Sequence, residues 1–305
     1  MFKRQDQAFE VFLTMAKSKK ATLIGLSAIL LWGMLALLTS FCSRIPAFEL
    51  TEITFFIAFL IGVVYFIKTG CNWSHLRQPI GVWVSGVIGL FGYHALYFAA
   101  MKSAPAIEVS LIAYLWPILI VVFSALLPQE KLRWYHVAGT VLSFLGIVLL
   151  LAAKGVRIDA THSFGYVLAL LCAVIWAGYS VFSRKYKAVP MVMTGAYCGV
   201  TALLSLICHM LFEQTVVPMP SEWLPALALG IGPVGVSFFA WNYGMKHGNL
   251  RLLGTLSYLA PLISGALLVC FGRSDYSWRL LAAGVLIMFG ALISVTDKLV
   301  RRTVA

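Results

Sequence analysis

The residues best suited to bind a ligand in this sequence are aromatic side chains near the middle of long apolar runs. They are Trp32, Trp116, Trp176, Tyr114 and Tyr258. At that depth an indole N–H or a phenol O–H needs a polar partner that hydrocarbon does not supply. Rings that meet from several helices can line a hollow in which a flat ligand stacks and an ammonium group rests on ring faces. A dry aromatic core between the helices is the alternative interpretation.

Other polar and aromatic side chains could serve the same hollow. Tyr93 and Tyr97 are four residues apart and share one face of a helix. The remaining candidates are His94, Glu108, Trp241 and Asn242. Glu108 could contact a substrate amine or hold Lys102, or it could be a helix N-terminal acid that the helix dipole favours. His94 is more often a hydrogen-bonded core histidine than a proton relay.

The elements that must position these residues are membrane-spanning helices. Of the 305 residues, 61% are hydrophobic and 11% are charged, whereas soluble chains carry roughly 45–50% and 25%. This composition excludes soluble enzymes, nucleic-acid-binding folds and disulfide-stapled secreted domains. Continuously apolar runs predict helices rather than a barrel. We expect ten spans, near 21–41, 48–67, 80–101, 105–127, 134–153, 163–183, 191–212, 223–245, 250–271 and 278–297.

The distribution of basic residues predicts the orientation of these spans. With the N-terminus inside, 17 of the 23 lysines and arginines fall in cytoplasmic segments, and seven of the 11 acidic residues fall outside. This bias is typical of ten spans with both termini cytoplasmic. The net charge of +12 is therefore interpreted as an insertion signal, and no nucleic-acid partner is expected. The first twenty residues indicate an uncleaved first span rather than a signal peptide.

The chain repeats itself at an offset of 144 residues. Trp32 corresponds to Trp176, Met101-Lys102 to Met245-Lys246, and Tyr114 to Tyr258. Because each repeat holds five spans, an odd number, the second copy must enter the membrane inverted. Inverted repeats of this kind are typical of secondary transporters. The all-α fold class we predict is thus ten transmembrane helices in two inverted five-helix repeats.

Helices interrupted at matching places mark the binding site in such folds. We expect kinks at Pro117 and Pro261, and a break near Gly232, Pro233 and Gly235; all five are candidate hinges. Glycines that merely permit close helix packing are the alternative for the glycine positions. No carboxylate lies at mid-depth, which favours uncoupled transport over proton-coupled transport, although His94 or Glu108 could still carry a proton.

Several stretches resemble the drug/metabolite transporter superfamily of EamA type, and within it the YddG-type aromatic amino acid exporters. The resemblance covers residues 19–300 and is carried by the runs 20–25, 106–109, 114–117, 241–242, 247–249 and 257–258. It implies a multi-pass protein of the bacterial inner membrane that exports phenylalanine, tyrosine and tryptophan. By position, the family's cavity residues would include Trp32, Tyr93, His94, Tyr97, Tyr114, Trp116 and Trp176. Residues 1–18 have no counterpart in the family pattern.

The sequence therefore predicts an aromatic amino acid exporter that works by alternating access around a central aromatic cavity. We expect a cytoplasmic segment 1–19, repeats 20–154 and 163–298, and a tail 299–305. The expected partners are the small-molecule substrate and the lipid bilayer, and the expected state is a monomer without metal or cofactor. A broader metabolite or drug exporter, including cationic drugs, is one alternative. A membrane-embedded enzyme is another, disfavoured because no catalytic motif is present.

Overall fold

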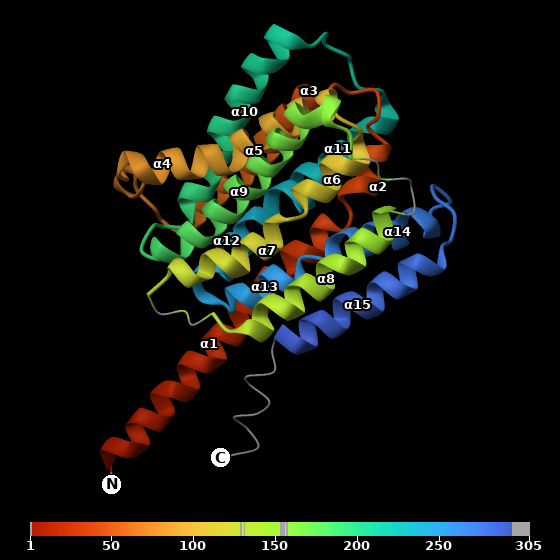
Figure 1. The fold of residues 1–305 in the computed structure, drawn as a ribbon. Coiled ribbons are helices and arrows are strands. Elements are labelled where there is room, and N and C mark those ends of the chain that lie inside the picture. Colours follow the sequence, from red (N-terminus) through yellow and green to blue (C-terminus); the bar gives the residue numbers. More distant parts are fainter. Residues whose placement is uncertain (1, 129, 131, 153–155, 157, 295–305) are drawn as a thin grey trace.

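A computed structural model describes the chain except residues 1, 129, 131, 153–155, 157 and 295–305. The described part is helical and contains no strand, and its helices lie side by side in one bundle (Figure 1). Nine helical stretches in this part are long and apolar enough to cross a membrane. The tenth expected span is represented by a shorter apolar helix, Trp278–Ser294. The expected tail 299–305 lies outside the described residues.

The helices follow the same order in each half of the chain, except that α1 and α2 of the first half correspond to the single helix α9 of the second. The first half contains α1 (Phe2–Trp32), α2 (Leu35–Ser40), α3 (Ala47–Lys68), α4 (Ile80–Val87), the π-helical turn η2 (Ile88–Gly92), α5 (Tyr93–Ser103), α6 (Ala106–Ala113), α7 (Trp116–Phe123) and α8 (Trp134–Ala152). The second half contains α9 (Ser163–Lys185), α10 (Val192–Phe212), α11 (Pro220–Leu229), the π-helical turn η5 (Gly230–Val236), α12 (Ser237–His247), α13 (Leu250–Leu256), α14 (Leu259–Cys270) and α15 (Trp278–Ser294). Short 3-10 turns lie at Trp73–Leu76, Ser124–Leu126 and Ala160–His162.

Equivalent helices of the two halves pack against each other in antiparallel pairs. In the α8–α15 pair, Gly139 lies against Gly290, and Gly146 lies against Ala283. As the residue number rises along α8, it falls along α15, so the two helices run in opposite directions. A Cβ atom on Gly139 would collide with the carbonyl oxygen of Gly290, so only glycine allows this approach.

The α3–α10 pair has the same antiparallel arrangement. Gly62 lies against Gly195, and Phe59 lies against Gly199. The Glu213 carboxylate, just beyond α10, accepts hydrogen bonds from the backbone N–H of Phe48 at 3.0 Å and 3.1 Å. It thereby satisfies a donor in the first turn of α3 that has no partner within the helix. The end of the pair at which α3 begins and α10 ends is thus held by hydrogen bonds as well as by packing.

The two halves are also interleaved. Helix α1 packs on α12, where Gly25 meets Gly244, and α9 packs on α5, where Gly165 meets Ala104. These contacts are equivalent under the 144-residue offset, because α5 and α12 begin and end 144 residues apart. Each half therefore completes the packing of the other.

The expected kinks are present as helix breaks. Helix α6 ends at Ala113 and α7 begins at Trp116, one residue before Pro117; α13 ends at Leu256 and α14 begins at Leu259, two residues before Pro261. The break near Pro233 takes the form of the π-helical turn η5, and the matching turn η2 interrupts the other half. A proline removes a backbone donor and disfavours a regular helix at this point.

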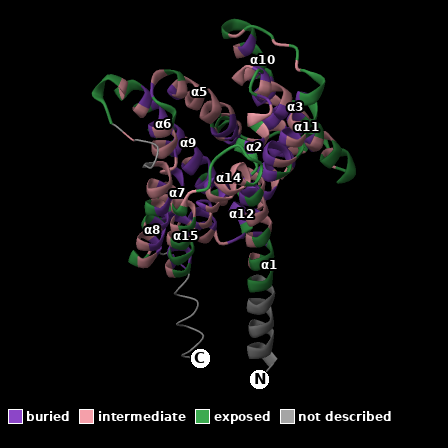
Figure 2. Ribbon diagram, turned by 90° about the vertical axis from the view of Figure 1, so that its right-hand side faces the viewer, coloured by how far each residue is buried: buried purple, intermediate pink, exposed green. Residues whose placement is uncertain are grey.

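Burial separates the inside of the bundle from its outer faces. Figure 2 shows buried residues along the inward faces of the helices and exposed ones at the loops and outer faces. Many exposed side chains are large and apolar, including Leu23, Leu203, Leu211 and Leu281. Such exposure is normal for a surface that faces lipid.

Candidate functional site

A cavity of about 570 Å³ opens between the two halves. Its wall includes residues of α1, α2, α3, α5, α6 and α7 from the first half and of α9, α12 and α14 from the second. It extends from the centre of the bundle to the segment that joins α2 to α3, where Cys42, Ser43 and Ile45 line it. This volume lies within the range of roughly 300–1,000 Å³ that small-molecule sites occupy.

Four tryptophans pack together at the inner end of this cavity, and we call this group the tryptophan floor: Trp32, Trp116, Trp176 and Trp241. The ring centroids of every pair are between 5.0 and 6.4 Å apart. Trp32, Trp116 and Trp176 line the cavity. Trp241 lies beneath them, 1% exposed, and donates its indole N–H to Ser180 Oγ at 3.0 Å.

Stacked tyrosines form one side wall. The rings of Tyr93 and Tyr97 on α5 are 6.0 Å apart and nearly parallel, at 8°. Tyr97 Oη lies 3.4 Å from Ser110 Oγ on α6. Tyr114 also lines the cavity. The wall offers both ring faces and hydroxyl groups to a ligand.

His94 also lines the cavity and is held by the helix itself. Its Nδ1 donates to the carbonyl of Leu90 at 2.7 Å, one turn back in the π-helical turn η2. Its ring packs edge-on against Phe55 at 5.1 Å and Phe98 at 6.2 Å. This is the arrangement of a hydrogen-bonded histidine in an aromatic wall.

Four residues expected at the site do not line this cavity: Glu108, Trp241, Asn242 and Tyr258. Glu108 is buried in the first turn of α6. Tyr258 is fully buried and donates its hydroxyl to the carbonyl of Tyr114 at 3.1 Å, which ties the two helix breaks together. Asn242 donates through Nδ2 to Tyr179 Oη at 3.0 Å and Thr194 Oγ1 at 3.2 Å.

The candidate hinge residues meet the cavity only in part. Pro233 lines the cavity next to Val234, whereas Gly232 and Gly235 belong to the same π-helical turn without lining it. Pro117 and Pro261 are buried directly behind the two helix breaks. Helix irregularity therefore borders the cavity from both halves.

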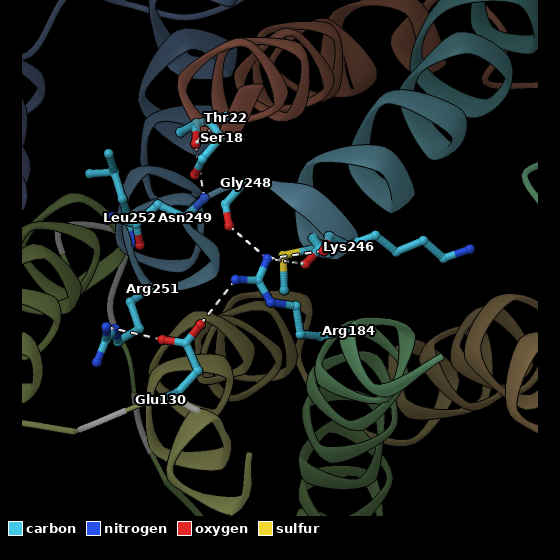
Figure 3. Close-up of polar contacts among 10 residues, drawn as sticks. Ser18, Thr22, Glu130, Arg184, Lys246, Gly248, Asn249, Arg251 and Leu252 are labelled. Carbon is cyan, nitrogen blue, oxygen red and sulfur yellow. Dashed lines mark hydrogen bonds and ion pairs between the residues drawn. The ribbon is translucent and has the colours of Figure 1, made fainter. Parts of the chain in front are cut away.

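The opposite end of the bundle, beyond the tryptophan floor, is closed by a charged cluster. Glu130 contacts Arg184 at 3.1 Å and Arg251 at 3.0 Å. Arg184 also donates to the carbonyls of Met245, Lys246 and Gly248, the last at 2.7 Å. Figure 3 shows Glu130 between the two guanidinium groups, with Arg184 reaching toward the α12–α13 connection. We call these three charged residues the Glu130 cluster.

A second contact supports this closure from α1. The backbone N–H of Asn249 donates to Thr22 Oγ1 at 2.9 Å, and the Asn249 side chain caps α13 by accepting from Leu252 N at 3.2 Å. Sequence reasoning missed the Glu130 cluster. One signal was available: Glu130 is the single acidic residue in the expected cytoplasmic connections between the first and the tenth span.

Comparison with known proteins identifies the same family twice along the chain. The model of the EamA-like transporter family matches residues 19–152 and again residues 163–296. The two matches are offset by 144 residues, as is the internal repeat.

Individual relatives are similar over nearly their whole length. A protein of Ancylobacter novellus named aromatic amino acid exporter YddG is 50% identical over 276 residues, covering 90% of this chain and 96% of the relative. A protein of the same name from Escherichia coli is 28% identical over 295 residues, covering 90% and 96%. A crystal structure at 49% identity superposes with a TM-score of 0.89 and covers 94% of this chain and 99% of the other.

Proposed function

This chain belongs to the EamA-like transporter family, and from that membership and the cavity we propose that it exports aromatic amino acids. The observation that carries the proposal is the tryptophan floor at the end of a cavity of about 570 Å³. The names of the relatives in Ancylobacter novellus and Escherichia coli support the same substrate class. The activity is transport rather than catalysis.

The cavity suits an aromatic amino acid at both of its ends. Burying an aromatic side chain against the floor contributes about 1.5–3 kcal/mol, and edge-to-face ring pairs add about 0.5–1.5 kcal/mol. Toward the α2–α3 segment the lining includes the hydroxyl groups of Thr39, Ser43 and Thr51. Hydroxyl groups there can hydrogen-bond the ammonium and carboxylate groups while the ring lies on the floor. The binding is modest enough to permit release.

In the proposed membrane placement, ten helices cross the bacterial inner membrane and both termini are cytoplasmic. The antiparallel pairing of α8 with α15 and of α3 with α10 supports two inverted repeats. The α2–α3 segment then lies outside, so the cavity faces outward and the Glu130 cluster closes the cytoplasmic side. A monomer suffices, because one chain supplies every wall of the cavity.

Transport follows from alternating access in this proposal. The outward cavity closes and a cavity on the cytoplasmic side opens as the halves rock about the floor. The helix breaks before Pro117 and Pro261 and the π-helical turn through Gly232, Pro233 and Gly235 act as hinges, because their backbone already departs from a regular helix. No carboxylate is among the cavity-lining side chains in the described part of the chain, which supports uncoupled transport.

The experiment that tests this function is uptake of labelled phenylalanine by liposomes containing the purified protein. We expect uptake above that of protein-free liposomes, inhibited by tyrosine and tryptophan, and equally fast with and without a pH gradient. Dependence on the gradient would contradict uncoupled transport. Inhibition by paraquat-like cations but not by tyrosine would replace the proposal with the broader drug exporter.

A further inference from the structure

A second hollow lies on the other side of the tryptophan floor, among α4, α9, α10 and α12. Its volume is about 20 Å³, which is room for about one water molecule. Polar side chains dominate one part of it, namely Ser85, Ser183, Thr194, Asn242 and Lys246. In the state described here it is too small for any substrate.

This hollow is the symmetry counterpart of the large cavity. Six of its lining residues correspond, at an offset of 144, to residues that line the large cavity. The pairs are Ser183 with Thr39, Tyr186 with Cys42, Val189 with Ile45, Thr194 with Leu50, Asn242 with Phe98, and Ser85 with Leu229. Because inverted repeats exchange roles when a transporter reorients, this hollow is the collapsed form of the vestibule that opens toward the cytoplasm. This step rests on the proposed function.

The two vestibules differ in chemistry where the repeats differ in sequence. Phe98 of the outer cavity corresponds to Asn242 of the hollow, and Leu50 corresponds to Thr194. The repeated Met-Lys pair adds a further difference. Lys246 lines the hollow and is 3% exposed, whereas its counterpart Lys102 is exposed and does not line the outer cavity.

The amino group of Lys246 has unused hydrogen-bonding capacity when it is protonated. Its Nζ donates to the carbonyl of Val189 at 2.8 Å, and an ammonium group has three donors. Among the described residues no carboxylate forms an ion pair with it. Figure 3 shows its side chain pointing away from Glu130 and Arg184. A buried ammonium without a counter-charge is costly, and a ligand carboxylate would relieve that cost.

Asn242 supplies the complementary group. It lies four residues before Lys246 on α12, so both side chains share one face. Its Nδ2 is used by Tyr179 and Thr194, but its Oδ1 is buried without a hydrogen-bond partner, and the residue is 4% exposed. An unsatisfied buried acceptor is unfavourable unless a ligand donor reaches it.

We propose that Lys246 and Asn242 form the loading site of the cytoplasmic vestibule, where they bind the α-carboxylate and the α-ammonium group of an incoming amino acid. The zwitterion is then recognised by charge on the cytoplasmic side and by ring stacking and hydroxyl groups on the outer side. The main discrimination against simple amines and simple acids arises at Lys246 and Asn242.

The test compares transport of phenylalanine with two analogues that each lack one charged group. Phenethylamine lacks the carboxylate and 3-phenylpropionate lacks the ammonium group. Initial rates at low concentration are measured in liposomes for wild type, Lys246→Gln and Asn242→Leu. Glutamine keeps a donor that can serve the Val189 carbonyl, which makes it the conservative replacement at this position. Lys102→Gln is the matched control in the other repeat, and Tyr179→Phe removes a bond to Asn242 without removing the amide.

We expect Lys246→Gln to lower the phenylalanine-to-phenethylamine rate ratio about tenfold, in line with a lost charge-assisted hydrogen bond. Asn242→Leu should lower the phenylalanine-to-phenylpropionate ratio to a similar extent. Both control variants should keep the wild-type ratios. If the substituted proteins transport all three compounds more slowly but with unchanged ratios, the two residues are structural and the loading site is wrong. If wild type transports no phenylalanine, the proposed function itself fails.

Discussion

Replacing Glu130 by glutamine should shift the protein from the outward-facing to the inward-facing state. In the described state the carboxylate lies 3.1 Å from Arg184 and 3.0 Å from Arg251. These contacts join the connection after α7 to the end of α9 and the start of α13, so they must separate when the cytoplasmic side opens. Glutamine keeps the shape of the side chain but removes the charge that holds both guanidinium groups.

The size of the shift follows from the burial of the cluster. The side chains are 18% and 14% exposed, so solvent screens the contacts only in part. A hydrogen bond to a charged group contributes about 1.5–3 kcal/mol, and glutamine can still accept one. A net loss of about 2 kcal/mol for the pair corresponds to roughly a 30-fold change in the ratio of the two states.

The assay is labelling of a cysteine placed in the cytoplasmic hollow. In a background without native cysteines, Ser183→Cys is exposed to an impermeant maleimide from the cytoplasmic side. Glu130→Gln should raise the labelling rate by roughly 30-fold, whereas Asp275→Asn, in an exposed loop, should leave it unchanged. An unchanged or lower rate with Glu130→Gln would refute the role of the cluster in closing this end.

Three further outcomes follow from the same structure. Trp116→Ala should reduce phenylalanine transport at least tenfold, since the loss of the aromatic contact and its buried area costs about 1.5–3 kcal/mol. The variant should still insert into the membrane, and the control Trp134→Ala, at a 78% exposed position, should transport normally. Gly139→Val should lower the melting temperature of the detergent-solubilised protein, because overpacking against Gly290 costs about 1–3 kcal/mol or more; an unchanged melting temperature would contradict the close α8–α15 contact. Burial, reinforced by the nearby Glu222 carboxylate, raises the pKa of the Cys42 thiol to about 11. Because the thiolate is the reactive form, the rate of Cys42 alkylation should keep rising with pH through pH 10. A rate that stops rising near pH 9 would show that the thiol is not held in this environment.

Much of the fold could be predicted because it depends on hydrophobicity and repetition. Continuously apolar runs near twenty residues long are stable in a bilayer as helices. Nine of the expected spans are long apolar helices in the described part of the chain. The 144-residue offset predicted which helices are equivalent. It also predicted that Pro117 and Pro261 would interrupt equivalent helices, because proline acts locally on its own backbone.

The cavity was predicted less completely. The depth of a side chain in the membrane can be inferred from the sequence, whereas the direction in which the side chain points cannot. Trp116 and Trp241 are both tryptophans inside apolar helices, yet the first lines the cavity and the second is buried behind the tryptophans that line it. The sequence predicts one hollow for Asn242 and Tyr93, whereas Asn242 lines the smaller hollow on the other side of the tryptophan floor. Which way a side chain points depends on helix rotation, and packing between repeats sets that rotation.

The Glu130 cluster was missed for a different reason. Charged residues in short connections were assigned to orientation alone, since the excess of Lys and Arg in cytoplasmic segments explains them. Arg184 and Arg251 are 67 residues apart in the sequence, and only the tertiary fold brings Glu130 between them. Long-range charge pairing carries no local pattern, so no spacing rule could have identified it.

The most direct test of alternating access is to label two introduced cysteines, one in each cavity, from each side of the membrane separately. Ser110→Cys lines the outer cavity and Ser183→Cys lines the hollow. We predict that an impermeant maleimide labels Ser110→Cys only from outside and Ser183→Cys only from the cytoplasm, and that a bulky adduct at the first position slows labelling at the second. Labelling of both positions from the same side would contradict alternating access. So would a labelling rate at Ser183→Cys that is unchanged by the adduct at Ser110→Cys.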